Sequence, residues 1–166
     1  MKSRTTLVLL VALVAVIAAG AAVSRLVATP RTVILVRHAE RADQSQDSLL
    51  SPTGEARAGH LAEVLGGLGV RTIYVTQYRR TQQTAQPLAQ RLGLMPMIIA
   101  AKDLAGRHLQ KGQDPVLVVG HNNTIPGLLH ELGVQETVEL PPEQFNDLFV
   151  VVTHRFGRPT FLRLRY

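Results

Sequence analysis

The sequence contains no cysteine and no tryptophan, and its aromatic side chains are limited to four Phe and three Tyr. The lack of cysteine excludes disulfides, cysteine-ligated zinc, a thiol nucleophile and a lipidated cysteine. It leaves the redox compartment open, because a cysteine-free chain is compatible with either. Apolar residues make up 46% of the 166 residues, so disorder is not expected and one globular domain is.

Acidic residues are also in the minority, at 12 against 18 basic residues, which gives a net charge of +6. Lys2, Arg4 and Arg25 flank an N-terminal apolar stretch, and without them 15 basic residues face 12 acidic ones. Four C-terminal arginines are spaced like the outer face of a hairpin: Arg155, Arg158, Arg163 and Arg165. This mild excess predicts no nucleic-acid partner.

The longest uncharged run covers residues 7–23. As a helix it would reach about 25 Å, slightly short of the hydrocarbon core of a bilayer. It is apolar on every side, whereas a buried core helix usually keeps a polar stripe. With Lys2 and Arg4 in front, residues 1–30 are predicted to be a signal peptide or an N-terminal membrane anchor, with Ala19 to Ala21 as a possible cleavage site. The rest of the chain is then expected to be exported to the periplasm or another extracytoplasmic space.

Residues 31–166 alternate β-branched apolar runs with helical patterns and contain no repeat. The alternation predicts one α/β domain: a three-layer α/β/α sandwich with a mostly parallel central sheet and a C-terminal antiparallel hairpin. The expected strands are residues 33–36, 72–76, 96–100, 116–119, 148–153 and 160–165. The expected helices are residues 51–66, 81–92, 103–111 and 124–132.

Polar side chains gather where three of these strands end. The first strand is followed by residues 37–40, the second by residues 76–80 and the fourth by residues 120–124. Ligands of open α/β sheets bind beyond the carboxyl ends of the strands. Three strand ends therefore bring two histidines and up to three arginines to one edge of the sheet.

Four segments carry a family resemblance: Arg37-His38-Ala39-Glu40, Leu50-Ser51-Pro52-Thr53-Gly54, Thr76 with Arg80 and Thr84-Ala85, and Val118-Val119-Gly120-His121. They resemble the Arg-His-Gly signature, the Leu-Ser/Thr-x-x-Gly helix start, the second-arginine segment and the second-histidine segment of the histidine phosphatase superfamily, also called phosphoglycerate mutase-like. Ala39 stands at the glycine position. Each segment is weakly specific alone, but their order and spacing over residues 31–132 are specific together.

The resemblance implies a metal-independent phosphomonoesterase without cofactors, in which His38 takes the phosphoryl group. One imidazole nitrogen attacks phosphorus while a backbone carbonyl holds the proton on the other. Arg37 and Arg80 would supply planar charged donors to the phosphoryl oxygens, and His121 a third donor as an imidazolium. The same cations disfavour protonation of His38. An arginine-rich pocket repels cations and no metal-ligand spacing is present, so no metal is expected.

The proton donor for the leaving group stays open. The mutase-like branch uses a glutamate in a motif that this chain lacks, and the acid phosphatase branch has an aspartate where Asn122 stands. Glu40 and Asp103 are the candidates, with a helix cap as the alternative role of Asp103. Gln44 is a candidate phosphate contact from the loop after the first strand.

The substrate is expected to be a phosphorylated small molecule or a cell-envelope glycan or lipid phosphate. Residues 37–45 resemble the exported branch thought to act on phosphorylated heptose of the lipopolysaccharide core. An uncleaved N-terminal segment would add the membrane as a partner. Two alternatives remain: a catalytically inactive phosphate-binding or scaffolding domain, and a phosphohistidine-protein phosphatase. A mutase is disfavoured because the short chain has no room for the insertions that recapture its substrate.

Overall fold

The computed structural model describes residues 30–109, 113–154 and 157–166. The predicted signal or anchor segment therefore lies outside the described residues, except for Pro30. Within the described ranges, no helix is both long enough and apolar enough to cross a membrane. The strands are β1 (Arg31–Arg37), β2 (Thr72–Thr76), β3 (Met97–Ile99), β4 (Val116–Gly120), β5 (Asp147–Thr153) and β6 (Thr160–Arg165). The helices are α2 (Pro52–Leu65), α3 (Arg79–Leu92), α4 (Gly106–Leu109) and α5 (Ile125–Glu131).

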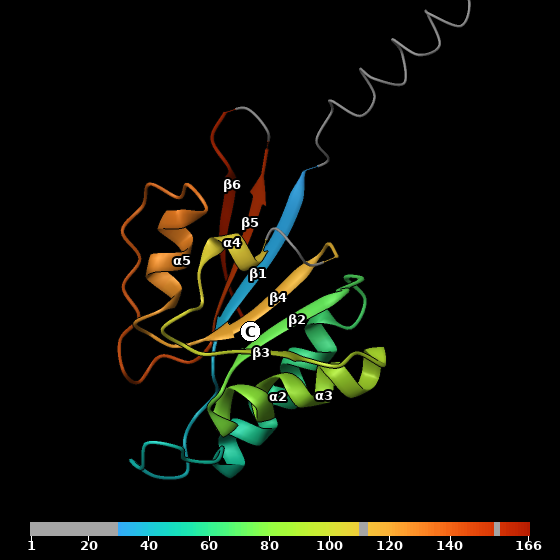
Figure 1. Ribbon diagram of the computed structural model, residues 1–166. Coiled ribbons are helices and arrows are strands. Elements are labelled where there is room, and N and C mark those ends of the chain that lie inside the picture. The colour runs from blue at the N-terminus through green and yellow to red at the C-terminus, as the bar shows by residue number, and fades with distance from the viewer. Residues whose placement is uncertain (1–29, 110–112, 155–156) are drawn as a thin grey trace, which may run out of the picture.

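The strands form one sheet in the order β3-β2-β4-β1-β5-β6 (Figure 1). β3, β2, β4 and β1 are parallel, and β5 runs antiparallel to both β1 and β6. This confirms the predicted mostly parallel sheet with its closing hairpin. The register pairs Arg37 with Gly120, so β1 and β4 end side by side. The residues that follow them, His38 and His121, are thereby brought to the same edge.

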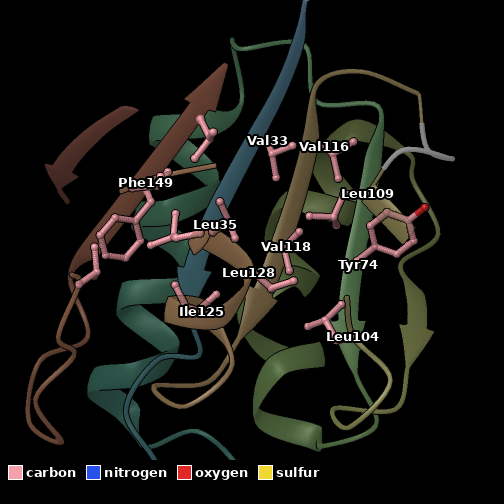
Figure 2. Close-up of a cluster of buried hydrophobic side chains, with 14 of the residues drawn as sticks. Val33, Leu35, Tyr74, Leu104, Leu109, Val116, Val118, Ile125, Leu128 and Phe149 are labelled. Carbon is pink, nitrogen blue, oxygen red and sulfur yellow. The ribbon is translucent and has the colours of Figure 1, made fainter. Parts of the chain in front are cut away.

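Helices cover both faces of the sheet, as the three-layer prediction requires. The side chains of β1 alternate between two buried clusters, because successive residues of a strand point to opposite faces. Val33 and Leu35 pack with α4 and α5 (Figure 2). Ile34 and Val36 pack with α2 and α3 on the other face. Phe149 of β5 is fully buried in the first cluster and stacks on Phe161, which fastens the hairpin to the core.

The start of α2 is fixed against the chain that leaves β1. Ser51 caps the helix by accepting a hydrogen bond from the Gly54 N–H at 3.1 Å, and Pro52 occupies the first turn. A Cβ at Gly54 would lie 2.3 Å from the carbonyl oxygen of Glu40, so only glycine fits there. Gly54 therefore lets the first turn of α2 pack against the backbone of Glu40, two residues after His38.

Two helix starts differ from the sequence prediction by more than one residue. α3 begins at Arg79, two residues earlier than expected, because the carboxylate of Asp47 accepts a hydrogen bond from the Arg79 N–H at 2.8 Å. α4 begins at Gly106 and not at Asp103. The Gly106 N–H donates to the Glu131 carboxylate at 2.6 Å, and Asp103 lies in the preceding turn. Both caps come from residues distant in sequence.

Candidate active site

The candidate site lies at the carboxyl edge of β1 and β4. Arg37, His38 and His121 are buried, with 5%, 3% and 5% of their surfaces exposed. The His38 N–H donates to the Gly120 carbonyl at 2.9 Å, which continues the pairing of the two strands into the site. The imidazole rings of His38 and His121 meet edge to face with centroids 5.3 Å apart. The structure therefore brings together both histidines predicted from the sequence.

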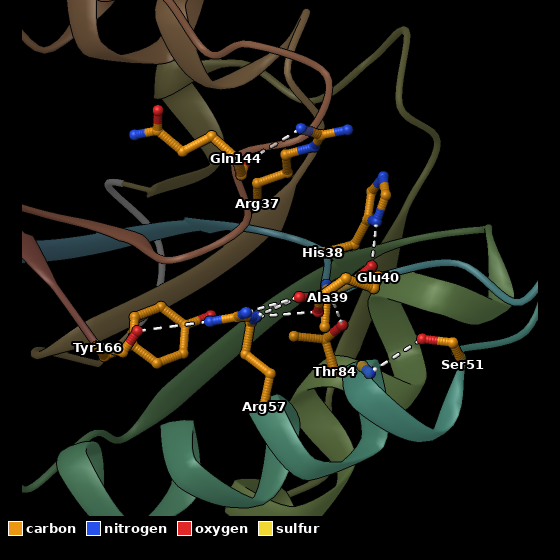
Figure 3. A network of polar contacts seen from close by, with 10 residues as sticks. Arg37, His38, Ala39, Glu40, Ser51, Arg57, Thr84, Gln144 and Tyr166 are labelled. Carbon is orange, nitrogen blue, oxygen red and sulfur yellow. Dashed lines mark hydrogen bonds and ion pairs between the residues drawn. The ribbon is translucent and has the colours of Figure 1, made fainter.

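The orientation of His38 leaves one ring nitrogen available for chemistry. Its Nδ1 lies 2.8 Å from the carbonyl oxygen of Ala39, and Figure 3 shows the other nitrogen turned away from that contact. The Ala39 N–H donates to Thr84 Oγ1 at 2.9 Å, which fixes the peptide that holds the ring. With Nδ1 protonated and donating, the lone pair lies on Nε2.

His38 is neutral at physiological pH. Burial is the main cause that lowers its pKa to about 3; the hydrogen bond with the Ala39 carbonyl opposes this, and the neighbouring His121, Arg80 and Arg37 also lower it. Desolvation and nearby cations both disfavour an imidazolium. The ring therefore keeps the nucleophilic lone pair that the sequence analysis expected.

Arg37 is held by the segment that precedes β5. Its Nη1 donates to the carbonyl oxygens of Pro141 and Gln144 at 2.9 and 3.0 Å, and its guanidinium lies 4.1 Å from the centroid of the Phe145 ring. Figure 3 shows the contact with Gln144. These contacts occupy one end and one face of the guanidinium, which fixes its plane.

Arg80 is held in a similar way from the other side. Its Nη1 donates to the Gln46 carbonyl at 2.7 Å, and its guanidinium lies 4.4 Å from the centroid of the Tyr78 ring. Arg79, by contrast, is an exposed neighbour in a 3.8 Å ion pair with Asp47. Of the two adjacent arginines, Arg80 belongs to the site, as the sequence predicted.

Both site arginines carry an unsatisfied donor. Among the described side chains, Nε of Arg37 and Nε of Arg80 are buried without a hydrogen-bond partner. Buried polar groups are normally paired, and an unpaired charged donor is costly. Two such donors beside a neutral His38 fit an anion with several acceptor oxygens, which is the property of a phosphoryl group.

His121 is positioned by a buried chain of hydroxyl groups. Its Nε2 lies 2.9 Å from Thr76 Oγ1, which lies 3.0 Å from Thr81 Oγ1, and the Thr81 hydroxyl donates to the Tyr78 carbonyl at 2.8 Å. Its Nδ1 faces Arg80 Nη2 at 3.5 Å. Burial, followed by the charges of Arg80 and Arg37, lowers the pKa of His121 to about 4. Without an anion the ring is therefore neutral, and the imidazolium expected from the sequence beside a bound phosphate stays a prediction.

These residues open onto a cavity of about 760 Å³. Its wall also includes Gln44, whose Oε1 accepts a 2.5 Å hydrogen bond from Arg41. Gln44 is thus placed to contact a ligand in the cavity, although its side-chain carbonyl oxygen already accepts a hydrogen bond from Arg41. Residues from every strand end predicted to form the site contribute to this wall.

The two predicted acids have different surroundings. Glu40 lies on the cavity wall but forms a bidentate ion pair with Arg57, with a shortest distance of 2.6 Å (Figure 3). Burial tends to raise the pKa of Glu40, but hydrogen bonds, chiefly from Arg57, lower it overall. Asp103 is exposed in a turn and does not line the cavity; it is also not the cap of α4. Neither placement favours proton donation.

Residues 141–146 build a side of the cavity that no sequence motif predicted. Pro142, Glu143 and Phe145 line the cavity, and Phe145 also lies 6.0 Å from the His38 ring between centroids. This segment matches none of the motifs that identified the other walls. Only the pairing of β5 with β1 brings it to the site.

The site and the fold together define a class: an α/β protein with a neutral histidine and two guanidiniums at the carboxyl edge of a parallel sheet. Residues 33–111 match the family described as the histidine phosphatase superfamily (branch 1). This region, slightly under half of the chain, therefore carries the sequence pattern of the histidine phosphatase superfamily. The matched region contains His38, Arg37 and Arg80, and His121 lies beyond it.

Solved structures support the fold. The protein histidine phosphatase SixA in complex with tungstate is 22% identical, with a TM-score of 0.65 over 81% of this chain and 96% of that one. The phosphoserine phosphatase of Entamoeba histolytica with 3-phosphoglyceric acid is 16% identical, with a TM-score of 0.63 over 81% and 96%. A mycobacterial glucosyl-3-phosphoglycerate phosphatase is 17% identical, with a TM-score of 0.60 over 80% and 97%. No curated protein sequence matches the chain.

Proposed function

We propose that this chain is a metal-independent phosphomonoesterase that works through a phosphohistidine at His38. The observation that carries the proposal is the His38 ring, with Nδ1 held by the Ala39 carbonyl and Nε2 left for attack beside two arginines. In the first step the Nε2–P bond forms and the P–O ester bond breaks. In the second, a water oxygen bonds to phosphorus, the N–P bond breaks, inorganic phosphate leaves, and a proton of the water restores the group that protonated the leaving alcohol.

The arginines and His121 stabilise the transferring group. The phosphoryl oxygens gain charge-assisted hydrogen bonds from donors that are already fixed in place. A bound phosphate raises the pKa of His121, because a nearby negative charge favours the imidazolium. Nε2 of His121 contacts the Thr76 hydroxyl, so Nδ1, the nitrogen that faces Arg80, is the one we propose to donate to the phosphate. His121 then becomes the third donor when substrate is bound.

The leaving group takes its proton from Glu143 in this account. Glu143 lines the cavity and, among the described residues, has no ion-pair partner, whereas Glu40 is held ionised by Arg57. The Glu143 side chain is exposed, so it is less firmly positioned for proton transfer than a buried carboxyl group would be. Substrates with good leaving groups are therefore favoured.

A phosphohistidine-protein phosphatase is the second candidate. The imidazole of a phosphohistidine is a good leaving group, which suits a site without a buried acid. The structurally similar SixA is named as a protein histidine phosphatase. Parallel assays with an aryl phosphate and a phosphohistidine peptide distinguish the two. No turnover of either would favour the inactive phosphate-binding or scaffolding domain.

Chelation is expected to leave the activity unchanged, and vanadate is expected to inhibit. Arg37, Arg80 and His121 take the place that a metal fills in other phosphatases, and vanadate mimics the five-coordinate phosphorus. Initial rates with an aryl phosphate after dialysis against EDTA, with and without vanadate, test this. Loss of activity in EDTA that zinc or magnesium restores would contradict the proposed mechanism.

We further propose that the domain is exported and is anchored to the membrane if residues 1–30 are retained. The support is the uncharged run at residues 7–23 behind Lys2 and Arg4. A reporter active only outside the cytoplasm, fused after Tyr166, is expected to be active, and mass spectrometry of the mature N-terminus would separate cleavage from anchoring. Activity of a cytoplasm-only reporter in the same position would refute export. An exported domain would meet phosphate groups of the cell envelope.

A further inference from the structure

We propose that the outer part of the active-site cavity is a second anion site centred on Arg41. The preferred substrates would then be phosphomonoesters that carry another acidic group, either a carboxylate or a second phosphate. This proposal rests on the phosphatase function proposed above and adds a substrate class to it.

Arg41 has a fixed place on the cavity wall. An antiparallel bridge pairs Arg41 with Leu50, and the Ala42 N–H donates to the Leu49 carbonyl at 2.9 Å. The preceding residue is held as well, because the Ser51 N–H donates to the Glu40 carbonyl at 2.9 Å. The backbone of Arg41 is thus tied to the start of α2, and its side chain lines the same cavity as Arg37 and Arg80.

Arg41 forms no ion pair with a carboxylate of the described residues, and Asp43 is within electrostatic reach without contacting it as an ion pair. Its guanidinium donates instead to the neutral side-chain amide of Gln44, at 2.5 Å. The nearby Asp43 carboxylate accepts from the Ser45 N–H at 2.8 Å and stays in the loop. Glu40, the next residue along the wall, is already paired with Arg57.

Three guanidiniums therefore face one cavity. After burial, the charge of Arg41 is the largest influence that lowers the pKa values of both Arg37 and Arg80, which shows that the three lie within electrostatic reach. The opposing carboxylate on the wall is that of Glu143, which is exposed. Arg37 is buried beside His38, whereas Arg41 is partly exposed farther out. A phosphate held by Arg37, Arg80 and His121 leaves Arg41 for another part of the substrate.

The size and polarity of the cavity suit such a substrate. Its volume of about 760 Å³ is in the range of small-molecule sites and exceeds what one phosphoryl group needs. The outer wall adds the exposed amides Asn122 and Asn123. A small polar substrate with a second anion fits these groups better than an apolar one does.

The test compares esters that differ only in the second group. Phosphoglycolate and ethyl phosphate share the phosphate and the chain length, and only the first has a carboxylate. For the wild-type protein, kcat/KM for phosphoglycolate is expected to exceed that for ethyl phosphate at least about 10-fold, the effect of one charge-assisted hydrogen-bonded pair. Glucose 1,6-bisphosphate against glucose 6-phosphate tests whether a second phosphate is accepted as well.

The variants assign the preference to one residue. Arg41→Gln is expected to bring the phosphoglycolate-to-ethyl-phosphate ratio to about 1–3, and Arg41→Lys to an intermediate value. Arg79→Gln is the matched control, because it removes an equal charge from a neighbouring arginine outside the cavity and should keep the wild-type ratio. A wild-type ratio near one for both ester pairs, or a ratio that Arg41→Gln leaves unchanged, would overturn the proposal.

A binding measurement separates this proposal from the phosphatase proposal. If no ester is hydrolysed, the phosphatase function fails, and isothermal titration still compares the affinities of phosphoglycolate and ethyl phosphate. Tighter binding of phosphoglycolate that Arg41→Gln removes would support the second anion site. Equal binding of the two compounds would reject it.

Discussion

His38→Ala is expected to lower the turnover of an aryl phosphate by at least about 10⁴-fold, because removal of a covalent nucleophile costs losses of this order or more. The variant keeps the arginines and His121, so phosphate binding should persist. The fold should also persist, since the neighbouring strand pairing runs through the backbone N–H of residue 38 and not through its ring. Steady-state kinetics of the purified domain measure the turnover, and circular dichroism measures whether the fold persists.

The control for this variant is His130→Ala. His130 is an exposed residue of α5 outside the cavity, and its loss should change turnover by less than about 2-fold. Turnover by His38→Ala within 10-fold of the wild type, with His130→Ala unchanged, would mean that the reaction does not need His38. A direct attack of water on phosphorus would then replace the covalent mechanism.

Arg80→Lys is expected to lower kcat/KM by about 10²–10³-fold, although it keeps the positive charge. A lysine places one ammonium where Arg80 presents a planar fork, and it lacks the buried Nε–H that has no partner among the described residues. It also cannot hold both the Gln46 carbonyl and a phosphoryl oxygen at fixed positions. The loss should therefore appear mainly in kcat, because donors aligned with the transition state lower the barrier of the chemical step.

Arg79→Lys is the control for this second prediction. Arg79 is exposed and pairs with Asp47, and a lysine at that position can keep the ion pair. It should retain activity within about 2-fold. If Arg80→Lys also retained activity within 3-fold, the planar geometry of Arg80 would not matter and charge alone would account for its role.

The sequence predicted the sheet more accurately than the helix starts. The strand expected at residues 72–76 is β2 as observed, because its β-branched residues are all buried within the sheet. The early start of α3 depends on Asp47 and the late start of α4 on Glu131, and each carboxylate lies far along the chain from the backbone N–H that donates to it. Local patterns carry no information on such caps, so the predicted ends were wrong there.

In the site, too, features set by local sequence were predicted and features set by distant partners were not. The strand ends indicated residues 37–40, 76–80 and 120–124, which the parallel register brings together. The resemblance to the histidine phosphatase superfamily then singled out Arg37, His38, Arg80 and His121 among them. The roles of Glu40 and Asp103 depended on partners that sequence does not show. The pair between Glu40 and Arg57 bridges β1 and α2, and the position of Glu143 follows from the packing of β5 beside β1.

The covalent intermediate is the central claim, and rapid acid–alkali quench of a single turnover tests it most directly. Phosphorus-labelled aryl phosphate is mixed with the enzyme for milliseconds, and the protein is then divided between acid and alkali. We expect label that is stable in alkali, is lost in acid, maps to the peptide containing His38 and is absent from His38→Ala. Full turnover without protein-bound label, or label on a peptide that lacks residue 38, would contradict the mechanism.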